Sequence, residues 1–159
     1  MMDAIEPSRD EPLYLEDLYV GLRFSTDFHV LDAQQIKAFA RQFDPQPFHL
    51  DEEAASRTLF GGLVASGWHT AAITMYLLTG MKPQLAGGIL GAGAEINWPT
   101  AARPGDVLHV ECELTEVKPS RSRPDRGVVT MRGETRTQRD SVVQILNAKL
   151  VVFRREVVT

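Results

Sequence analysis

One short segment of the chain combines a carboxylate, an imidazole and two prolines. Residues 44–49 read DPQPFH, which puts Asp44 and His49 five positions apart on a backbone that the two prolines stiffen. Histidine is the side chain best matched to proton transfer near neutral pH, so the spacing indicates an acid/base pair aimed at one water. The alternative is that Asp44 and the prolines only end a helix and His49 is an ordinary loop histidine, because such helix-stop signals are common.

A second candidate lies where glycines precede an apolar helix. Residues 60–67 read FGGLVASG, with Ser66 as the expected N-cap and Gly67 as the first helical residue. Backbone N–H groups at a helix N-terminus carry partial positive charge, so the Gly67 amide is a candidate donor to a developing oxyanion. A close contact between helix and sheet explains the same glycine, and the two interpretations can coexist.

A third candidate is the basic segment 118–127, KPSRSRPDRG, in a loop between two expected strands. Arginine forks suit phosphate groups, although most charged runs are simply solvated. The chain from Ser120 onward carries nine basic and four acidic residues, so this part has a local surplus of positive charge. The whole chain has a net charge of −4, which argues against nonspecific nucleic-acid binding.

Four other residues with reactive side chains are expected to have structural roles. His29 and His109 lie on the polar faces of expected strands and should face solvent, whereas His69 should be a packed, hydrogen-bonded core residue. Cys112 alternates with apolar residues and should be a small core residue. A single cysteine excludes an internal disulfide, and no Cys/His cluster has structural-zinc spacing, so we expect no metal.

The elements that position these residues follow from apolar periodicity. Alternation over 22–30 predicts a strand, and Asp32 should cap a helix that stops at Asp44, ahead of a short rigid loop. Asp51 should cap a second short helix, and the helix over 67–79 has almost no polar face, so we expect it to be buried. Period-two patterns predict four further strands, the last of them central, over residues 88–98, 108–114, 128–138 and 141–154. Small residues at 91–94 should let the sheet approach the helix closely.

Length and composition bound the overall architecture. The 159 residues, 43% hydrophobic and 24% charged, are typical of one globular domain. No apolar run is long enough to span a membrane and the first ten residues are too acidic for a signal peptide, so we expect a cytoplasmic protein. We predict an N-terminal extension over 1–20 and a single α+β domain over 21–159.

The segment from Phe43 to Gly67 resembles the MaoC-like dehydratases and (R)-specific enoyl-CoA hydratases. Their signature runs Asp, any residue, Asn, Pro, an apolar residue and His, and the matching positions here are Asp44, Pro47, Phe48 and His49. Gln46 stands where the family usually has Asn. The resemblance extends more loosely from Phe24 to Phe153 and so covers most of the chain.

The resemblance implies a hot-dog fold, in which an antiparallel sheet wraps a central helix, here the helix over 67–79. It also implies a homodimer or larger homo-oligomer, with an acyl-CoA site at the subunit boundary. The implied activity is addition of water to a 2-enoyl-CoA, or its removal from a 3-hydroxyacyl-CoA. A hot-dog acyl-CoA thioesterase and a catalytically silent acyl-CoA-binding subunit are the alternatives, because a fold does not dictate its chemistry.

The resemblance also assigns roles to particular residues. Asp44 and His49 activate the water and return a proton to the α-carbon, and the Gly67 amide receives the charge on the thioester oxygen, so that neither metal nor organic cofactor is expected. Gln46 and Ser66 join the residues that bind substrate. We further expect the CoA phosphates to lie against the basic loop, at Arg121, Arg123 and Arg126.

Overall fold

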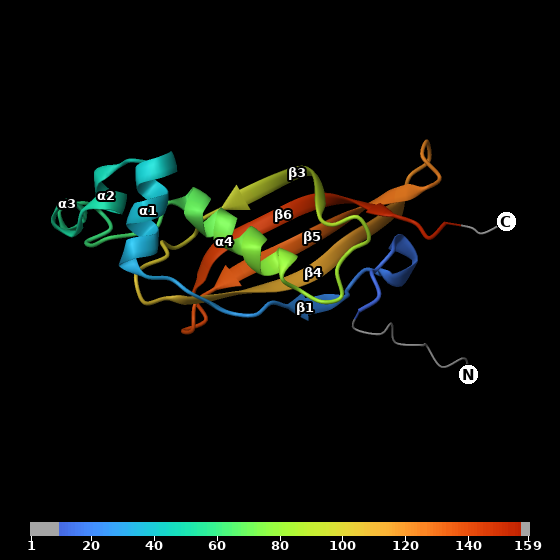
Figure 1. Cartoon of the computed structure of the whole chain (residues 1–159), viewed down its shortest axis with the longest axis horizontal. Coiled ribbons are helices and arrows are strands. Elements are labelled where there is room, and N and C mark those ends of the chain that lie inside the picture. The colour runs from blue at the N-terminus through green and yellow to red at the C-terminus, as the bar shows by residue number, and fades with distance from the viewer. Residues whose placement is uncertain (1–9, 157–159) are drawn as a thin grey trace.

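The computed structural model describes residues 10–156, in which a curved sheet carries helices on one side and at one end (Figure 1). The elements are a 3-10 turn η1 (Leu15–Asp17), β1 (Arg23–Ser25), β2 (His29–Val30), α1 (Ala33–Phe43), α2 (Pro47–Leu50), α3 (Glu52–Ser56), α4 (Gly67–Thr79), β3 (Leu90–Asn97), β4 (Val107–Pro119), β5 (Arg126–Arg136) and β6 (Val142–Phe153). The order of helices and strands confirms the predicted α+β layout.

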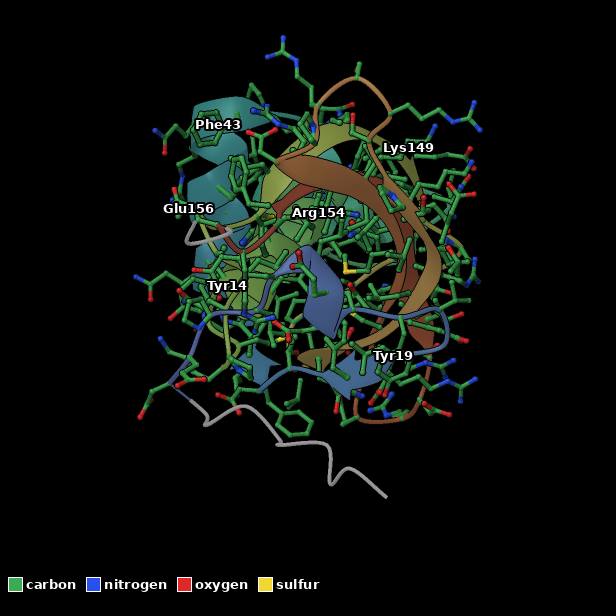
Figure 2. All side chains as sticks on the ribbon, turned by 90° about the vertical axis from the view of Figure 1, so that its right-hand side faces the viewer. Tyr14, Tyr19, Phe43, Lys149, Arg154 and Glu156 are labelled. Carbon is green, nitrogen blue, oxygen red and sulfur yellow. The ribbon has the colours of Figure 1, made fainter. Side chains whose placement is uncertain are left out.

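The sheet is antiparallel throughout, with strand order β1-β4-β5-β6-β3 and with β2 paired to β4. Helix α4 lies across one face of this sheet, while α1, α2 and α3 gather at one end (Figure 1). Seen from the opposite end, the long strands curve around α4 (Figure 2). Strand β6 lies between β5 and β3, as its two apolar faces predict for a central strand.

Helix α4 begins and ends where the sequence predicts. The Ser66 side chain accepts a hydrogen bond from the Trp68 N–H, and Gly80 is the C-cap. The expectation that this helix is buried on all sides is wrong for the single chain, because the sheet covers only one of its faces. Ile73 and Leu77 pack into the core, whereas Trp68 is 60% and Tyr76 is 70% exposed.

The strand predicted over 22–30 is interrupted. Thr26 is buried between β1 and β2, and its hydroxyl accepts a hydrogen bond from the Val110 N–H at 2.9 Å, where a strand carbonyl would otherwise serve. The same hydroxyl donates to the Asp27 carbonyl. The side-chain alternation changes at this point, so Phe24 points toward the core and Phe28 is exposed.

Within residues 10–156, strand β3 forms an open edge of the sheet. It pairs with β6 on one side, and almost all of its residues are exposed. A Cβ at Gly91 or Gly93 would meet no atom within 4 Å, so the expected close approach of helix and sheet at 91–94 is wrong. The reason is that α4 lies over β4 and β6 rather than over β3.

The described part of the N-terminal extension packs against the rest of the domain. Leu13 forms a bridge with Leu85, and Leu15 is buried in the hydrophobic core. Cys112 is also buried in this core, as predicted, and burial raises the pKa of its thiol to about 12. Across residues 10–156, no helix is both long enough and apolar enough to cross a membrane.

Candidate active site

Asp44 and His49 come together at the end of α1. The backbone N–H of Asp44 closes α1 by donating to the Ala40 carbonyl, and Pro47 then begins α2. The expected rigid loop therefore contains one helical turn, which places His49 Nε2 3.3 Å from Asp44 Oδ2. The predicted pair is thus formed, with the imidazole buried and the carboxylate largely buried.

The second ring nitrogen of His49 fixes the position of one hydrogen. Nδ1 lies 2.7 Å from the Val64 carbonyl oxygen, and a carbonyl can only accept. The network therefore assigns a hydrogen to Nδ1, and Nε2 is left to exchange a proton at the side that faces Asp44. A carboxylate and an imidazole nitrogen arranged in this way can share one proton or hold one water between them.

Hydrogen bonds keep the Asp44 carboxylate ionised. Burial acts to raise its pKa, but the Ser66 hydroxyl, the Gln46 amide and His49 together hold the pKa below its ordinary value. The Gln46 Nε2 group donates to Asp44 Oδ1 at 2.6 Å. Gln46 and Ser66 thus contact the candidate base, and at neutral pH Asp44 is available to accept a proton.

The N-terminus of α4 lies beside this pair. The segment before it is tied on both sides, because Val64 N–H donates to the Phe48 carbonyl and Ala65 N–H donates to the Ala102 carbonyl. Gly67 is the first helical residue, and N–H groups of the first turn have no acceptor within the helix. The structure therefore brings a free backbone donor to the same end of the molecule as the Asp44–His49 pair.

Gly67 also makes a close contact, which is the other interpretation of this glycine. A Cβ at this position would lie 2.6 to 2.9 Å from three indole carbons of Trp98. The contact is with a side chain that follows β3 rather than with the sheet backbone.

The predicted phosphate-binding arginines lie elsewhere in the chain. Strand β4 runs on to Pro119, so Arg121 and Arg123 lie in a six-residue loop at the end of the sheet far from α1, α2 and α3 (Figure 1). Thirteen residues of β4 span about 40 Å, and the active-site end lies near its first residue. Arg126 forms an ion pair with Asp125 and stacks over Phe153. Within one chain, these arginines do not join the site.

The other histidines differ from expectation. His69 is buried and its ring stacks on Phe39, yet its Nδ1 has no hydrogen-bond partner in the described structure. Burial, with the nearby charges of His29 and His49, lowers the pKa of His69 to about 4. His29 and His109 are half-buried, so the prediction that they face solvent is wrong: His29 bonds to Gln35, and the His109 ring lies against Phe28 and beside Glu111.

Two site residues escaped the sequence analysis. The sequence predicts Trp98 only as the last residue of the strand over 88–98, and its contact with Gly67 joins positions far apart in the sequence. Gln144 is 1% exposed and accepts the Trp98 indole hydrogen at 2.9 Å. The only signal for Gln144 was a polar residue within the most apolar strand.

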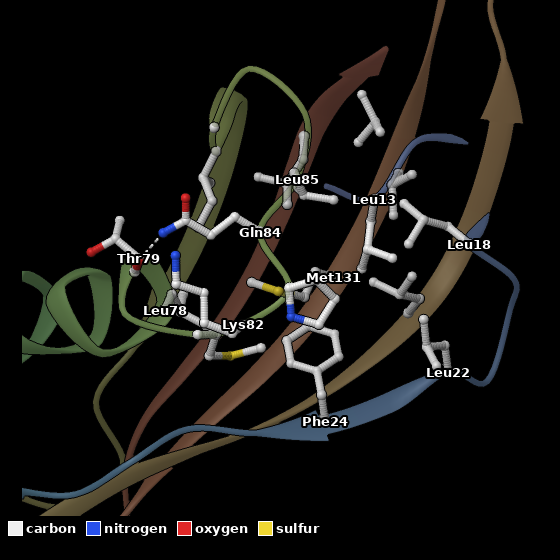
Figure 3. Close-up of a pocket in the computed structure, with 18 residues that line it drawn as sticks. Leu13, Leu18, Leu22, Phe24, Leu78, Thr79, Lys82, Gln84, Leu85 and Met131 are labelled. Atoms are coloured by element: carbon white, nitrogen blue, oxygen red, sulfur yellow. Dashed lines mark hydrogen bonds between the residues drawn. The ribbon is translucent and has the colours of Figure 1, made fainter. Parts of the chain in front are cut away.

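An apolar cavity of about 320 Å³ lies at the C-terminal end of α4 (Figure 3). Leu78 from α4, Phe24 from β1 and Met131 from β5 line it, and Leu13 and Leu18 close it from the N-terminal side. Its volume is at the lower end of the range for small-molecule pockets. Within residues 10–156, no group of three or more His, Cys, Asp or Glu side chains is arranged to hold a metal ion.

Comparison with known proteins gives consistent matches. The family model described as "MaoC like domain" matches residues 21–137. A curated 3-hydroxybutyryl-CoA dehydratase from Methylorubrum extorquens is 32% identical over 111 residues, which cover 70% of this chain and 69% of the relative.

Solved structures match over nearly the whole chain. A MaoC-like dehydratase from Rhodospirillum rubrum is 60% identical with a TM-score of 0.89, covering 91% of this chain and 99% of that one. An (R)-hydratase from A. caviae is 24% identical with a TM-score of 0.66, covering 88% of this chain and 99% of that one, and it supports the fold alone. The predicted hot-dog fold is confirmed. The chain belongs to the MaoC-like dehydratase family.

Proposed function

We propose that the protein is a hydro-lyase that adds water to a 2-enoyl-CoA thioester, or removes it from a 3-hydroxyacyl-CoA. The observation that carries this proposal is the Asp44–His49 pair, whose proton-exchanging atoms face each other at 3.3 Å beside the N-terminus of α4. The relationship to a 3-hydroxybutyryl-CoA dehydratase supports the same reaction class.

In the hydration direction, the Asp44–His49 pair, called the dyad from here on, directs the hydroxyl group of one water to the β-carbon and a proton to the α-carbon. The water oxygen forms a bond to the β-carbon while Asp44 and His49 Nε2 accept a proton from that water. The electron pair of the double bond moves toward the thioester, and the dyad then delivers a proton to the α-carbon. The reaction consumes one water and leaves the dyad in its starting protonation state.

The developing charge has a matched donor. As the β-carbon is attacked, negative charge builds on the thioester oxygen, and the Gly67 N–H at the start of α4 donates to it. Side chains and backbone thus supply proton transfer and charge stabilisation, so the proposed reaction needs neither a metal nor an organic cofactor.

The apolar cavity is suited to the distal end of a long acyl chain. Helix α4 has thirteen residues and is about 20 Å long, with the dyad near its first turn and the cavity at its last. A filling substitution, Leu78→Phe, should therefore impair long enoyl-CoAs more than short ones. Equal effects on both would place the acyl chain elsewhere.

We further propose a homodimer formed across the edge of β3. This strand has an open side, and the neighbouring face of α4 exposes Trp68, Met75 and Tyr76. A two-fold axis pairs identical strands antiparallel, so the partner's basic loop would approach the dyad end of the first chain. Arg121 and Arg123 would then contact the CoA phosphates across the subunit boundary.

Mixed dimers test this arrangement. One subunit carries Asp44→Asn, and the other carries Arg121→Ala with Arg123→Ala. The intact dyad should then work with the intact arginines of the other subunit and show a near-parental KM for a CoA thioester. A KM as high as that of the double-arginine homodimer would contradict action across the boundary, and a monomer in light scattering would contradict the dimer.

The test of the reaction itself uses a panel of enoyl-CoAs with short to long acyl chains. Loss of the enoyl-thioester absorbance without release of free thiol supports hydration. Free thiol would instead identify a thioesterase, and binding without either signal would identify a silent acyl-CoA-binding subunit. His49→Ala is the matched control, because it removes the exchanging nitrogen while leaving Gly67 in place.

A further inference from the structure

The Trp98 side chain lies against Gly67, and the proposed mechanism has not used it. Its indole carbons are in such close contact with Gly67 that a methyl group at Gly67 would lie 2.6 Å from the nearest one. Trp98 remains 40% exposed, so part of the residue is accessible from solvent. The ring is therefore next to the backbone N–H that is proposed to receive the thioester oxygen.

A buried polar network holds this indole. Trp98 Nε1 can only donate, and it donates to Gln144 Oε1 at 2.9 Å. This fixes the orientation of the Gln144 amide, whose Nε2 donates to Thr74 Oγ1 at 3.0 Å. The Thr74 hydroxyl donates to the Thr70 carbonyl at 2.9 Å, and so the Thr135 hydroxyl, 2.6 Å away, must donate to Thr74.

Each hydrogen bond in this network thus has one consistent direction. Thr74, Thr135 and Gln144 are each no more than 1% exposed, and the network links α4, β5 and β6. Burying so many polar groups is costly unless all are paired, and a fully paired network selects one geometry. Its single link to a partly exposed side chain is the bond to Trp98.

We propose that Trp98 is a substrate-positioning wall and that Gln144 acts through it as a positioning residue. A 2-enoyl thioester is planar, because its double bond is conjugated with the carbonyl. The indole confines this plane beside the Gly67 N–H and excludes water from the developing oxyanion. The proposal deepens the hydratase function proposed above and rests on it.

A double-mutant cycle tests whether Gln144 acts through Trp98. Gln144→Leu keeps a similar volume but removes the acceptor, and Trp98→Phe keeps an aromatic ring but removes the N–H. Since a displacement of about 1 Å can cost about a hundredfold in rate, we expect Gln144→Leu to lower kcat about tenfold or more with little change in KM. In the Trp98→Phe background, the same substitution should cost less than about twofold. Equal losses in both backgrounds, or no loss in either, would overturn the proposal.

A binding measurement separates this inference from the proposed reaction. In a Trp68→Phe background, Trp98 is the remaining tryptophan, and its fluorescence should change when a saturated acyl-CoA thioester is added. A fluorescence change without any turnover of enoyl-CoA by the parent protein would refute the hydratase function but support the role of Trp98 as a substrate-positioning wall. Turnover by the parent protein without any fluorescence change would refute the role of Trp98 but support the hydratase function. If Gln144→Leu fails to fold by circular dichroism, this measurement decides the question.

Discussion

Replacing Gly67 by alanine should disable the site through Trp98, although alanine keeps the backbone N–H. The added methyl carbon would lie 2.6, 2.7 and 2.9 Å from three indole carbons, whereas carbon atoms pack favourably at about 3.5 to 4.0 Å. The indole must therefore retreat by about 1 Å. A displacement of this size can cost about a hundredfold in turnover, and this is the loss we expect in kcat.

The same displacement has a stability cost. It lengthens or breaks the 2.9 Å bond from Trp98 to Gln144, which is worth about 1 kcal/mol. For a chain of this length, such a loss lowers Tm by about 2 to 4 °C. The assay follows enoyl-thioester absorbance for kcat and circular dichroism for Tm. Parental values of both for Gly67→Ala would refute the argument that the Gly67–Trp98 contact constrains the site.

Proline at position 67 distinguishes the effect of the contact with Trp98 from the effect of losing the backbone N–H. Gly67 is the first helical residue, where proline is tolerated, but proline also carries a Cβ that meets the indole. We therefore compare Gly67→Pro with Gly67→Ala in a Trp98→Ala background, in which the ring is gone. Losing an oxyanion donor costs roughly a hundredfold to a thousandfold in turnover. Equal rates for the two variants in this background would move the oxyanion role to another donor.

Three further predictions concern the ionisable residues. Asp44→Asn and His49→Ala should each lower turnover by at least about a hundredfold with CoA-thioester binding retained, and near-parental hydration by either folded variant would contradict the dyad. Burial lowers the pKa of His69 from 6.5 to about 4 in the folded chain. Between these pH values the unfolded state therefore binds more protons than the folded state. The free energy of unfolding should fall by up to about 3 kcal/mol as the pH drops through this window. Urea unfolding should show a weaker pH dependence for His69→Gln, and an unchanged dependence would refute the assignment. Replacing Arg121 and Arg123 by alanine should raise KM for a CoA thioester but not for a pantetheine thioester, with kcat nearly unchanged; an unchanged KM for the CoA substrate would remove the loop from the site.

The parts of the fold that follow local rules could be predicted from the sequence. The Asp32 side chain accepts from the Gln35 N–H, and α1 ends at Phe43 with Asp44 as its C-cap before Pro45, as capping and proline stereochemistry require. Helix α4 also has the predicted bounds. The Asp44–His49 pair follows from the same local geometry, because a helix end and one further helical turn bring the two side chains together.

Most of the incorrect predictions depend on contacts between distant parts of the chain. The strand over 22–30 is interrupted because the Thr26 hydroxyl bonds to Val110, and nothing in an alternating pattern reports such a bond. The exposed face of α4 is as apolar as its buried face, so composition cannot tell which side the sheet covers. The exposed apolar face of α4 is the one that the proposed homodimer would cover.

The role of Gly67 depends on the close contact and on the N–H donor together. A glycine at the first position of a helix leaves its N–H accessible, and the lack of a side chain lets an indole contact its Cα. The indole can keep that position because Gln144 holds it from the core, through a hydrogen bond that Thr74 orients. The buried network, the aromatic wall and the backbone donor therefore form one continuous structure. Gly67 and Trp98 are 31 residues apart along the chain. A substitution of Gln144 in the core is thus expected to change the chemistry at Gly67 through Trp98, although Gln144 does not contact the substrate.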